Sequence, residues 1–197
     1  MISTLPNLEA VRAASAIEVA SMLRQMEGSS QEMLASSVLA MPGASDIEIG
    51  DVEKRIGHRL APVFRRVISM YELGGLEWCG VVFGGAPSFI KFLGTQLASG
   101  FAGTGPSVER CPVLASSAGY EIRIQTDADE ILARPIDGEV QSSAIVASDI
   151  DLLLRALGSL SLMTQVDDEL EAAMDVARLV GAPTSHAFWL DRIRGFA

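Results

Sequence analysis

The chain has 197 residues, an apolar fraction of 49% and a formal net charge of −10 at neutral pH. This length suits one domain with a substantial core, and no apolar run approaches the roughly 20 residues that a membrane-spanning helix needs. The acidic balance argues against nucleic-acid binding by the whole surface, which requires clustered cations. We expect a cytoplasmic protein, because residues 1–22 lack the basic and compact apolar regions of a secretory signal.

Two helices are predicted at the N-terminus. Apolar residues recur at helical spacing from Asn7 to Gln25, and a second helix is expected from about Ser30 to Met41, before Pro42-Gly43. Joined by a short loop, they predict a helical hairpin over residues 1–43. It can be an appendage to a single α+β domain over residues 44–197.

The segment Asp51–Leu73 combines the clearest amphipathic pattern with the chain's basic cluster. Its apolar side carries Ile56, Leu60, Val63, Val67 and Met70 or Tyr71. The other side and its flank carry Lys54, Arg55, His58, Arg59, Arg65 and Arg66. Ala44–Asp46 offers residues that can cap this helix. Pro62 predicts a kink or a break near Leu60-Ala61, because proline removes a backbone donor and crowds the preceding turn.

A sheet is predicted between residues 76 and 147. Leu76–Phe83 is expected to form one buried strand, and Gly84–Ser88 to lead into a helix from about Pro87 to Ala98. Ser99–Pro112 is rich in glycine and proline, which is typical of a mobile loop.

Four further strands are expected in an antiparallel meander. They are Val113–Ser117, Tyr120–Thr126, Glu130–Pro135 and Glu139–Ala147. Asp137-Gly138 is a two-residue hairpin signal, and the alternation in Glu121–Gln125 predicts one buried face and one in water.

Three helices are predicted at the C-terminal end. Ser148-Asp149 should begin the first, Thr164-x-x-Asp167 resembles a capping box for the second, and Thr184 or Ser185 should cap the last. The element order predicts an α+β fold. Its N-terminal helices precede an antiparallel meander at about 113–147, with one further strand at 76–83, and its C-terminal helices pack on the sheet.

Two groups of side chains are candidates for binding a partner. The basic residues Lys54, Arg55, Arg59, Arg65 and Arg66 could form ion pairs inside the protein or between subunits, bind an acidic macromolecule, or hold a small anion. The cluster of Phe188, Trp189, Ile193 and Phe196 is either an exposed patch for a partner or a part of the core.

A ligand site is a weaker candidate at Gly84, Gly85 and Ser88. This turn lies between a strand and a helix N-terminus, where free backbone N–H groups attract anions. It matches neither GxGxxG nor GxxxxGK[ST], so a structural turn is favoured.

Catalytic and metal sites are not predicted. Cys79 lies in an apolar run, which should raise the pKa of a thiol rather than activate it with His58 or His186. Cys111 is too distant in sequence to form a zinc knuckle with Cys79. Asp127, Asp129 and Glu130 lack the DxDxDG pattern of a calcium loop. We therefore expect no cofactor.

The favoured hypothesis is a non-enzymatic protein that binds another protein, with an adaptor, chaperone-like subunit, assembly factor or inhibitor as its roles. Its partner could have an acidic surface, and a homodimer is possible. The first alternative is a small enzyme or anion-binding domain near Gly84–Ser88 and the basic residues of 51–73. The second is an acidic inhibitor that imitates nucleic acid with the carboxylates of residues 101–150.

Overall fold

The computed structural model describes residues 2–25, 36–98, 111–136, 143–163 and 166–195. The loop expected at Ser99–Pro112 lies almost wholly outside the described residues, and so does the turn expected at Asp137-Gly138. Within the described part of the chain, no helix combines the length and the apolar character that crossing a membrane requires.

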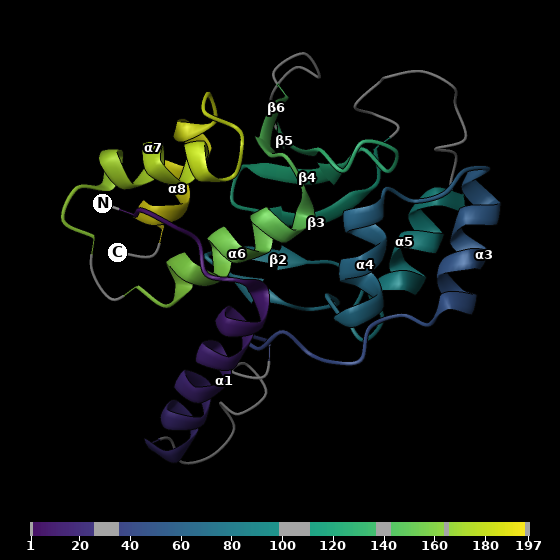
Figure 1. Ribbon diagram of the computed structural model, residues 1–197, viewed down its shortest axis with the longest axis horizontal. Helices are drawn as coiled ribbons and strands as arrows, with labels where there is room; N and C mark the ends of the chain where they lie inside the picture. Colours follow the sequence, from purple (N-terminus) through teal and green to yellow (C-terminus); the bar gives the residue numbers. More distant parts are fainter. Residues whose placement is uncertain (1, 26–35, 99–110, 137–142, 164–165, 196–197) are drawn as a thin grey trace.

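A six-stranded antiparallel sheet forms the centre of the fold, with its strands in chain order from edge to edge (Figure 1). The strands are β1 (Glu77–Trp78), β2 (Val81–Phe83), β3 (Val113–Ser117), β4 (Tyr120–Ile124), β5 (Ile131–Pro135) and β6 (Ala144–Ala147). With helices on either side of the strands in sequence, this arrangement confirms the predicted α+β fold and its meander.

The prediction of a single strand over residues 76–83 is wrong in detail, because this run folds into a hairpin of two short strands, β1 and β2. Cys79 and Gly80 form its turn with φ angles of 50° and 64°. Two consecutive residues with positive φ are typical of the tight turns that match the strand twist. Apolar residues border the turn on both sides, at Trp78, Cys79 and Val81, so hydrophobicity alone did not reveal it.

Strand β4 also departs from the expected alternation. Arg123, which should have faced water, is buried. Its guanidinium donates to Glu121 Oε2 at 2.7 Å and to the Cys111 carbonyl at 2.8 Å. A buried cation is tolerated where such charged and polar partners satisfy it.

The amphipathic segment forms two helices, as Pro62 predicted: α3 (Asp46–Ile56) and α4 (Pro62–Met70). Ser45 and Glu48 form a capping box at the start of α3, and Gly57 ends that helix with a left-handed φ of 79°. The start of α4 has no side-chain cap from its own N-cap residue, Ala61. The carboxylate of Asp129, in the β4–β5 turn, accepts hydrogen bonds from the first N–H groups of α4 instead.

At the N-terminus, the first predicted helix is confirmed as α1 (Leu8–Gln25). The second is not observed over residues 36–41, which form a turn and a β-bridge between Ala40 and Glu72. The rest of that expected helix lies outside the described residues.

The remaining helices are α5 (Phe89–Ala98), α6 (Ile150–Ser161), α7 (Glu169–Leu179) and α8 (His186–Arg194). Asp149 caps α6 as expected. Helix α7 begins later than the proposed capping box at Thr164-x-x-Asp167 requires, because its N-cap is Asp168. Helix α6 contacts both edge strands, β6 and β1, and therefore crosses the sheet from one edge to the other.

Candidate functional site

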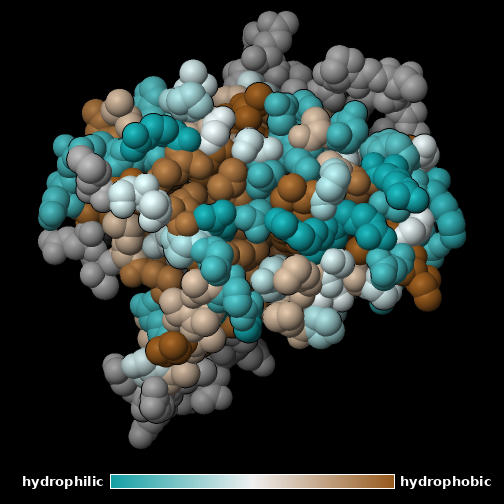
Figure 2. All heavy atoms as spheres, in the orientation of Figure 1, coloured by the Kyte–Doolittle hydropathy of each residue, from teal (hydrophilic) through white to brown (hydrophobic). Residues whose placement is uncertain are grey.

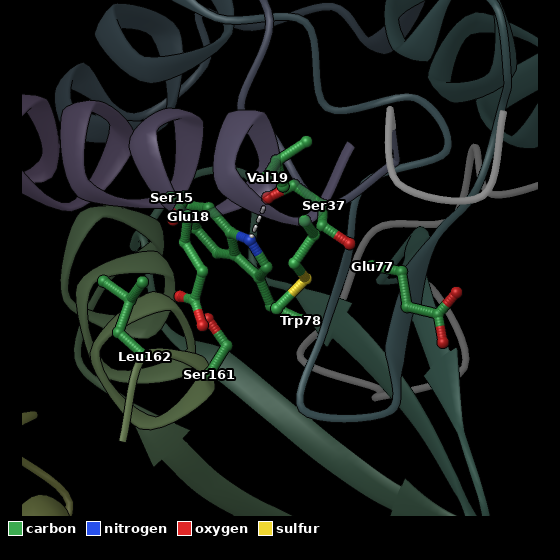
Figure 3. A pocket seen from close by; sticks show the side chains of 9 residues that line it. Ser15, Glu18, Val19, Ser37, Glu77, Trp78, Ser161 and Leu162 are labelled. Atoms are coloured by element: carbon green, nitrogen blue, oxygen red, sulfur yellow. Dashed lines mark hydrogen bonds between the residues drawn. The ribbon is translucent and has the colours of Figure 1, made fainter. Parts of the chain in front are cut away.

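A hollow of about 150 Å³ opens where α1, β1 and the C-terminal end of α6 meet (Figure 3). Its walls come from four segments that are far apart in sequence. Among the described residues, those that line it are Ser15, Glu18, Val19, Met22, Ser37, Glu77, Trp78, Ser161 and Leu162. Apolar atoms make up most of the lining surface, so the hollow suits an apolar group.

The wall formed by α1 depends on a close contact with α6. Val11 is buried against α6 at Gly158, where a Cβ atom would lie 2.3 Å from the Val11 side chain. One turn further along α1, the buried Ser15 hydroxyl donates to the Val11 carbonyl at 3.0 Å. Because this bond satisfies the hydroxyl within the helix, Ser15 presents a compact surface to the hollow.

Trp78 on β1 is held in place by its own polar atom. Its indole N–H donates to the Ser37 carbonyl at 2.8 Å, a bond drawn in Figure 3. The ring is almost wholly buried, and Gly158 leaves space for it beneath α6. Trp78 therefore forms a fixed apolar part of the lining.

Two carboxylates border the hollow, and they point differently. The Glu18 side chain is partly buried and extends toward Ser161, whereas the Glu77 carboxylate points away from Trp78 (Figure 3). Neither carboxylate has an ion-pair partner among the residues that the structure describes. Within the described part of the chain, the negative charge that Glu18 brings to the wall is therefore not neutralised.

The far half of α1 projects from the body of the protein (Figure 1). Ile17 is 70% exposed and Met22 is 40% exposed on this part of the helix. Apolar brown atoms stand among paler and teal ones on the projecting helix in Figure 2. Of these two side chains only Met22 lines the hollow, so one partly exposed apolar side chain stands at its edge.

The basic residues predicted as a partner-binding face are largely paired with carboxylates of the same chain. Arg65 contacts Asp46 at 2.8 Å and Glu53 at 3.4 Å. Arg66 lies 3.7 Å from Asp151 of α6. In the same way Lys54 pairs with Asp51 at 3.3 Å. Lys54, Arg65 and Arg66 therefore form ion pairs inside the protein, which is one of the alternatives given for the basic residues.

Arg55 and Arg59 are the exceptions in the basic cluster. Both are exposed, and neither has an ion pair in the described structure. The break between α3 and α4 also divides the cluster, so its members do not form one continuous helix face. His58 lies in this break, where its Nδ1 is 2.9 Å from the Arg59 carbonyl oxygen.

The C-terminal cluster lies in the core. Phe188, Trp189 and Ile193 are 4%, 0% and 4% exposed, and the Trp189 indole donates to the Val146 carbonyl of β6. Phe196 is outside the described residues. The alternative in which this cluster closes the core is the one observed, and the described aromatic side chains are not accessible to a partner.

The Gly84–Ser88 turn is filled by groups of the protein itself. A Cβ atom at Gly84 or Gly85 would lie 2.5 or 2.2 Å from atoms of the Phe92 side chain. The Glu72 carboxylate accepts a hydrogen bond of 2.7 Å from the Phe89 N–H at the start of α5. A carboxylate already occupies the helix N-terminus, so the geometry does not favour an anion site there.

Thiol and metal chemistry find no support in the described residues. Burial raises the pKa of the Cys79 thiol to about 12, and it also raises the pKa of Cys111. His186 is exposed on α8. No group of three His, Cys, Asp or Glu side chains close enough to bind a metal occurs in the described ranges. Of the acidic turn, Asp129 serves as the cap of α4.

Sequence reasoning did not single out Glu18, Trp78 or the buried Arg192. The Arg192 guanidinium lies 5.8 and 5.5 Å from the ring centroids of Tyr120 and Phe188. It has no ion pair in the part of the chain described, and burial lowers its pKa. Arg192 therefore acts as a stacked element of the core.

No protein family, curated protein or solved structure matches the chain.

Proposed function

We propose that the protein is a non-enzymatic binding partner of another protein, and that the hollow beside Trp78 receives one apolar side chain of that partner. Its roles would be those of an adaptor, a chaperone-like subunit, an assembly factor or an inhibitor.

The observation that carries the proposal is the size of the hollow, together with its lining. Sites for cofactors and drug-sized ligands usually have volumes of about 300–1,000 Å³. An apolar cavity of about 150 Å³ is large enough for a molecule of the size of benzene. The hollow, at about 150 Å³, matches a single leucine, methionine or phenylalanine side chain rather than a whole cofactor.

The surroundings of the hollow support the same function. A partner that inserts a side chain beside Trp78 would also cover the exposed part of Met22, which lines the hollow on α1. Burying one large apolar side chain is worth about 1.5–3 kcal/mol, which corresponds to roughly a tenfold to hundredfold gain in affinity. The hollow alone would therefore contribute measurably to the stability of a complex.

The test is to obstruct the hollow from its rim. Met22→Trp places a larger ring at the rim, and because Met22 is partly exposed the change should leave the fold intact. Purified tagged protein is used to isolate a stoichiometric partner from cells of its own source, and a second copy of the chain counts as a partner. We expect Met22→Trp to weaken that complex at least tenfold, measured by titration calorimetry.

The matched control is Met174→Trp on α7, because Met174 is also an exposed methionine, at 57%, but does not line the hollow. This variant should bind as tightly as the unmodified protein. Equal affinity of both variants would show that the partner binds elsewhere, and the absence of any stoichiometric partner or dimer would contradict the proposed function itself.

A further inference from the structure

The hollow has a polarity that restricts what can enter it. Its floor is apolar, but the partly buried Glu18 carboxylate extends along one wall toward Ser161 (Figure 3). A carboxylate beside an apolar floor attracts a cation of the occupant by Coulomb interaction, while the apolar part of the occupant lies against the floor.

The end of α6 adds to the negative potential at the same wall. Helix α6 ends at Ser161 with Leu162 as its C-cap, and both residues line the hollow. The last carbonyl groups of a helix carry a partial negative charge, so cations are stabilised at a helix C-terminus. Glu18 and the α6 terminus therefore act in the same direction, although they belong to different elements.

The two arginines on these helices whose side chains the structure describes are engaged elsewhere. Arg12 of α1 forms an ion pair with Glu9, and Arg155 of α6 binds Asp151 and the carbonyl groups of Leu5 and Pro6. Neither arginine lines the hollow. Among the described residues, no cation of the chain neutralises Glu18.

We infer that the occupant of the hollow is an apolar side chain adjacent to a lysine or arginine, whose cationic head meets Glu18 and the C-terminal end of α6. This inference rests on the proposed function, since it specifies the chemistry of the same partner. It also implies a basic segment in the partner, whereas the basic cluster of α3 and α4 had suggested an acidic one.

The inference can be tested with three small probes of similar shape and different charge: phenethylammonium, 2-phenylethanol and 3-phenylpropanoate. Each is titrated into the full-length protein labelled with ¹⁵N at tryptophan. The chain has two tryptophans, so the Trp78 indole N–H reports on the hollow, and the buried Trp189 serves as an internal reference. A Trp189→Phe variant assigns the two signals.

We expect phenethylammonium to shift the Trp78 signal at a concentration about threefold to tenfold lower than 2-phenylethanol does, with 3-phenylpropanoate the weakest. The preference should shrink in 0.5 M NaCl, because salt screens partly exposed charges. Glu18→Gln keeps the shape of the wall and should abolish the preference. Glu77→Gln is the matched control, since its carboxylate points away from Trp78, and it should preserve the preference.

The remaining outcomes separate this inference from the proposed function. If the cation and the alcohol bind equally, the hollow accepts an apolar group without selecting charge, so the inference fails and the proposed function stands. If the preference survives in Glu18→Gln, the assignment to Glu18 is wrong. If no probe shifts the Trp78 signal before that of Trp189, the hollow does not bind apolar groups and both proposals fail.

Discussion

Cys79 illustrates how the surroundings of one residue decide its chemistry. Its side chain is buried in the β1–β2 turn, and its Sγ donates to the Leu157 carbonyl of α6 at 3.2 Å. Desolvation is the main reason that its pKa is raised to about 12, and the neighbouring Arg192 offsets this only in part. The apolar run around Cys79 was enough to predict the direction of this shift from sequence.

The thiol of Cys79 should therefore be unreactive in the folded protein. With a pKa near 12, about one molecule in ten thousand carries the thiolate at pH 8, and the thiolate is the reactive form. In a Cys111→Ser variant, we expect iodoacetamide to modify Cys79 only as fast as the protein unfolds, as followed by mass spectrometry. Cys111 in a Cys79→Ser variant is the comparison, because it is less buried and should react at least tenfold faster. Rapid labelling of folded Cys79 would contradict its burial in the β1–β2 turn.

At the scale of the elements, sequence predicts the features that neighbouring residues determine. Pro62 marked the boundary between α3 and α4 because its effect is confined to the preceding turn. The carboxylate of Asp129 that completes the start of α4 lies 65 residues from Phe64, so no local pattern pointed to it. The cap that Glu72 provides for α5 was hidden for the same reason.

The hollow could be predicted from sequence even less well than these two caps, because its lining residues come from separate parts of the chain. Ser15, Glu18 and Val19 look like ordinary positions of an amphipathic helix, and Trp78 looks like an ordinary residue of a buried strand. They become a site only because α6 crosses the sheet and brings its C-terminal end against α1 and β1. Such a crossing depends on tertiary packing, which the spacing of apolar residues does not reveal.

Two mid-helix glycines should respond in opposite ways to alanine. Gly158→Ala on α6 would bring a methyl group to 2.3 Å from Val11 and 3.0 Å from Trp78, so it should separate α1 from α6. We expect a loss of about 1–3 kcal/mol in the free energy of unfolding. Gly50→Ala on α3 has no atom within 4 Å and should instead gain about 0.5–1 kcal/mol from helix propensity. Urea denaturation measures both, and a stabilising Gly158→Ala would refute the close contact that shapes the hollow.

At the scale of the whole molecule, segments from both ends of the chain meet in one core. Leu8 and Val11 of α1 belong to the same buried cluster as Val176 of α7 and Trp189 of α8. Polar contacts follow the same path: the Ile2 N–H donates to Asp175 of α7 at 2.9 Å. These contacts bear on whether residues 1–43 are an appendage, a division that stays a prediction.

Substitutions at opposite ends of this core can decide the question. Val11→Ala and Val176→Ala each remove two buried methyl groups, and we expect both to lower the free energy of unfolding by about 2 kcal/mol. Far-ultraviolet circular dichroism and the near-ultraviolet signal of the tryptophans should record one coincident urea transition in each variant.

Ile17→Ala, at an exposed position on the same helix as Val11, should change stability by no more than about 0.5 kcal/mol. If Val11→Ala instead split the transition and left the tryptophan signal unmoved, the N-terminal segment would unfold independently. The hollow would then lie on the boundary between two units, and closing it with a partner would join them.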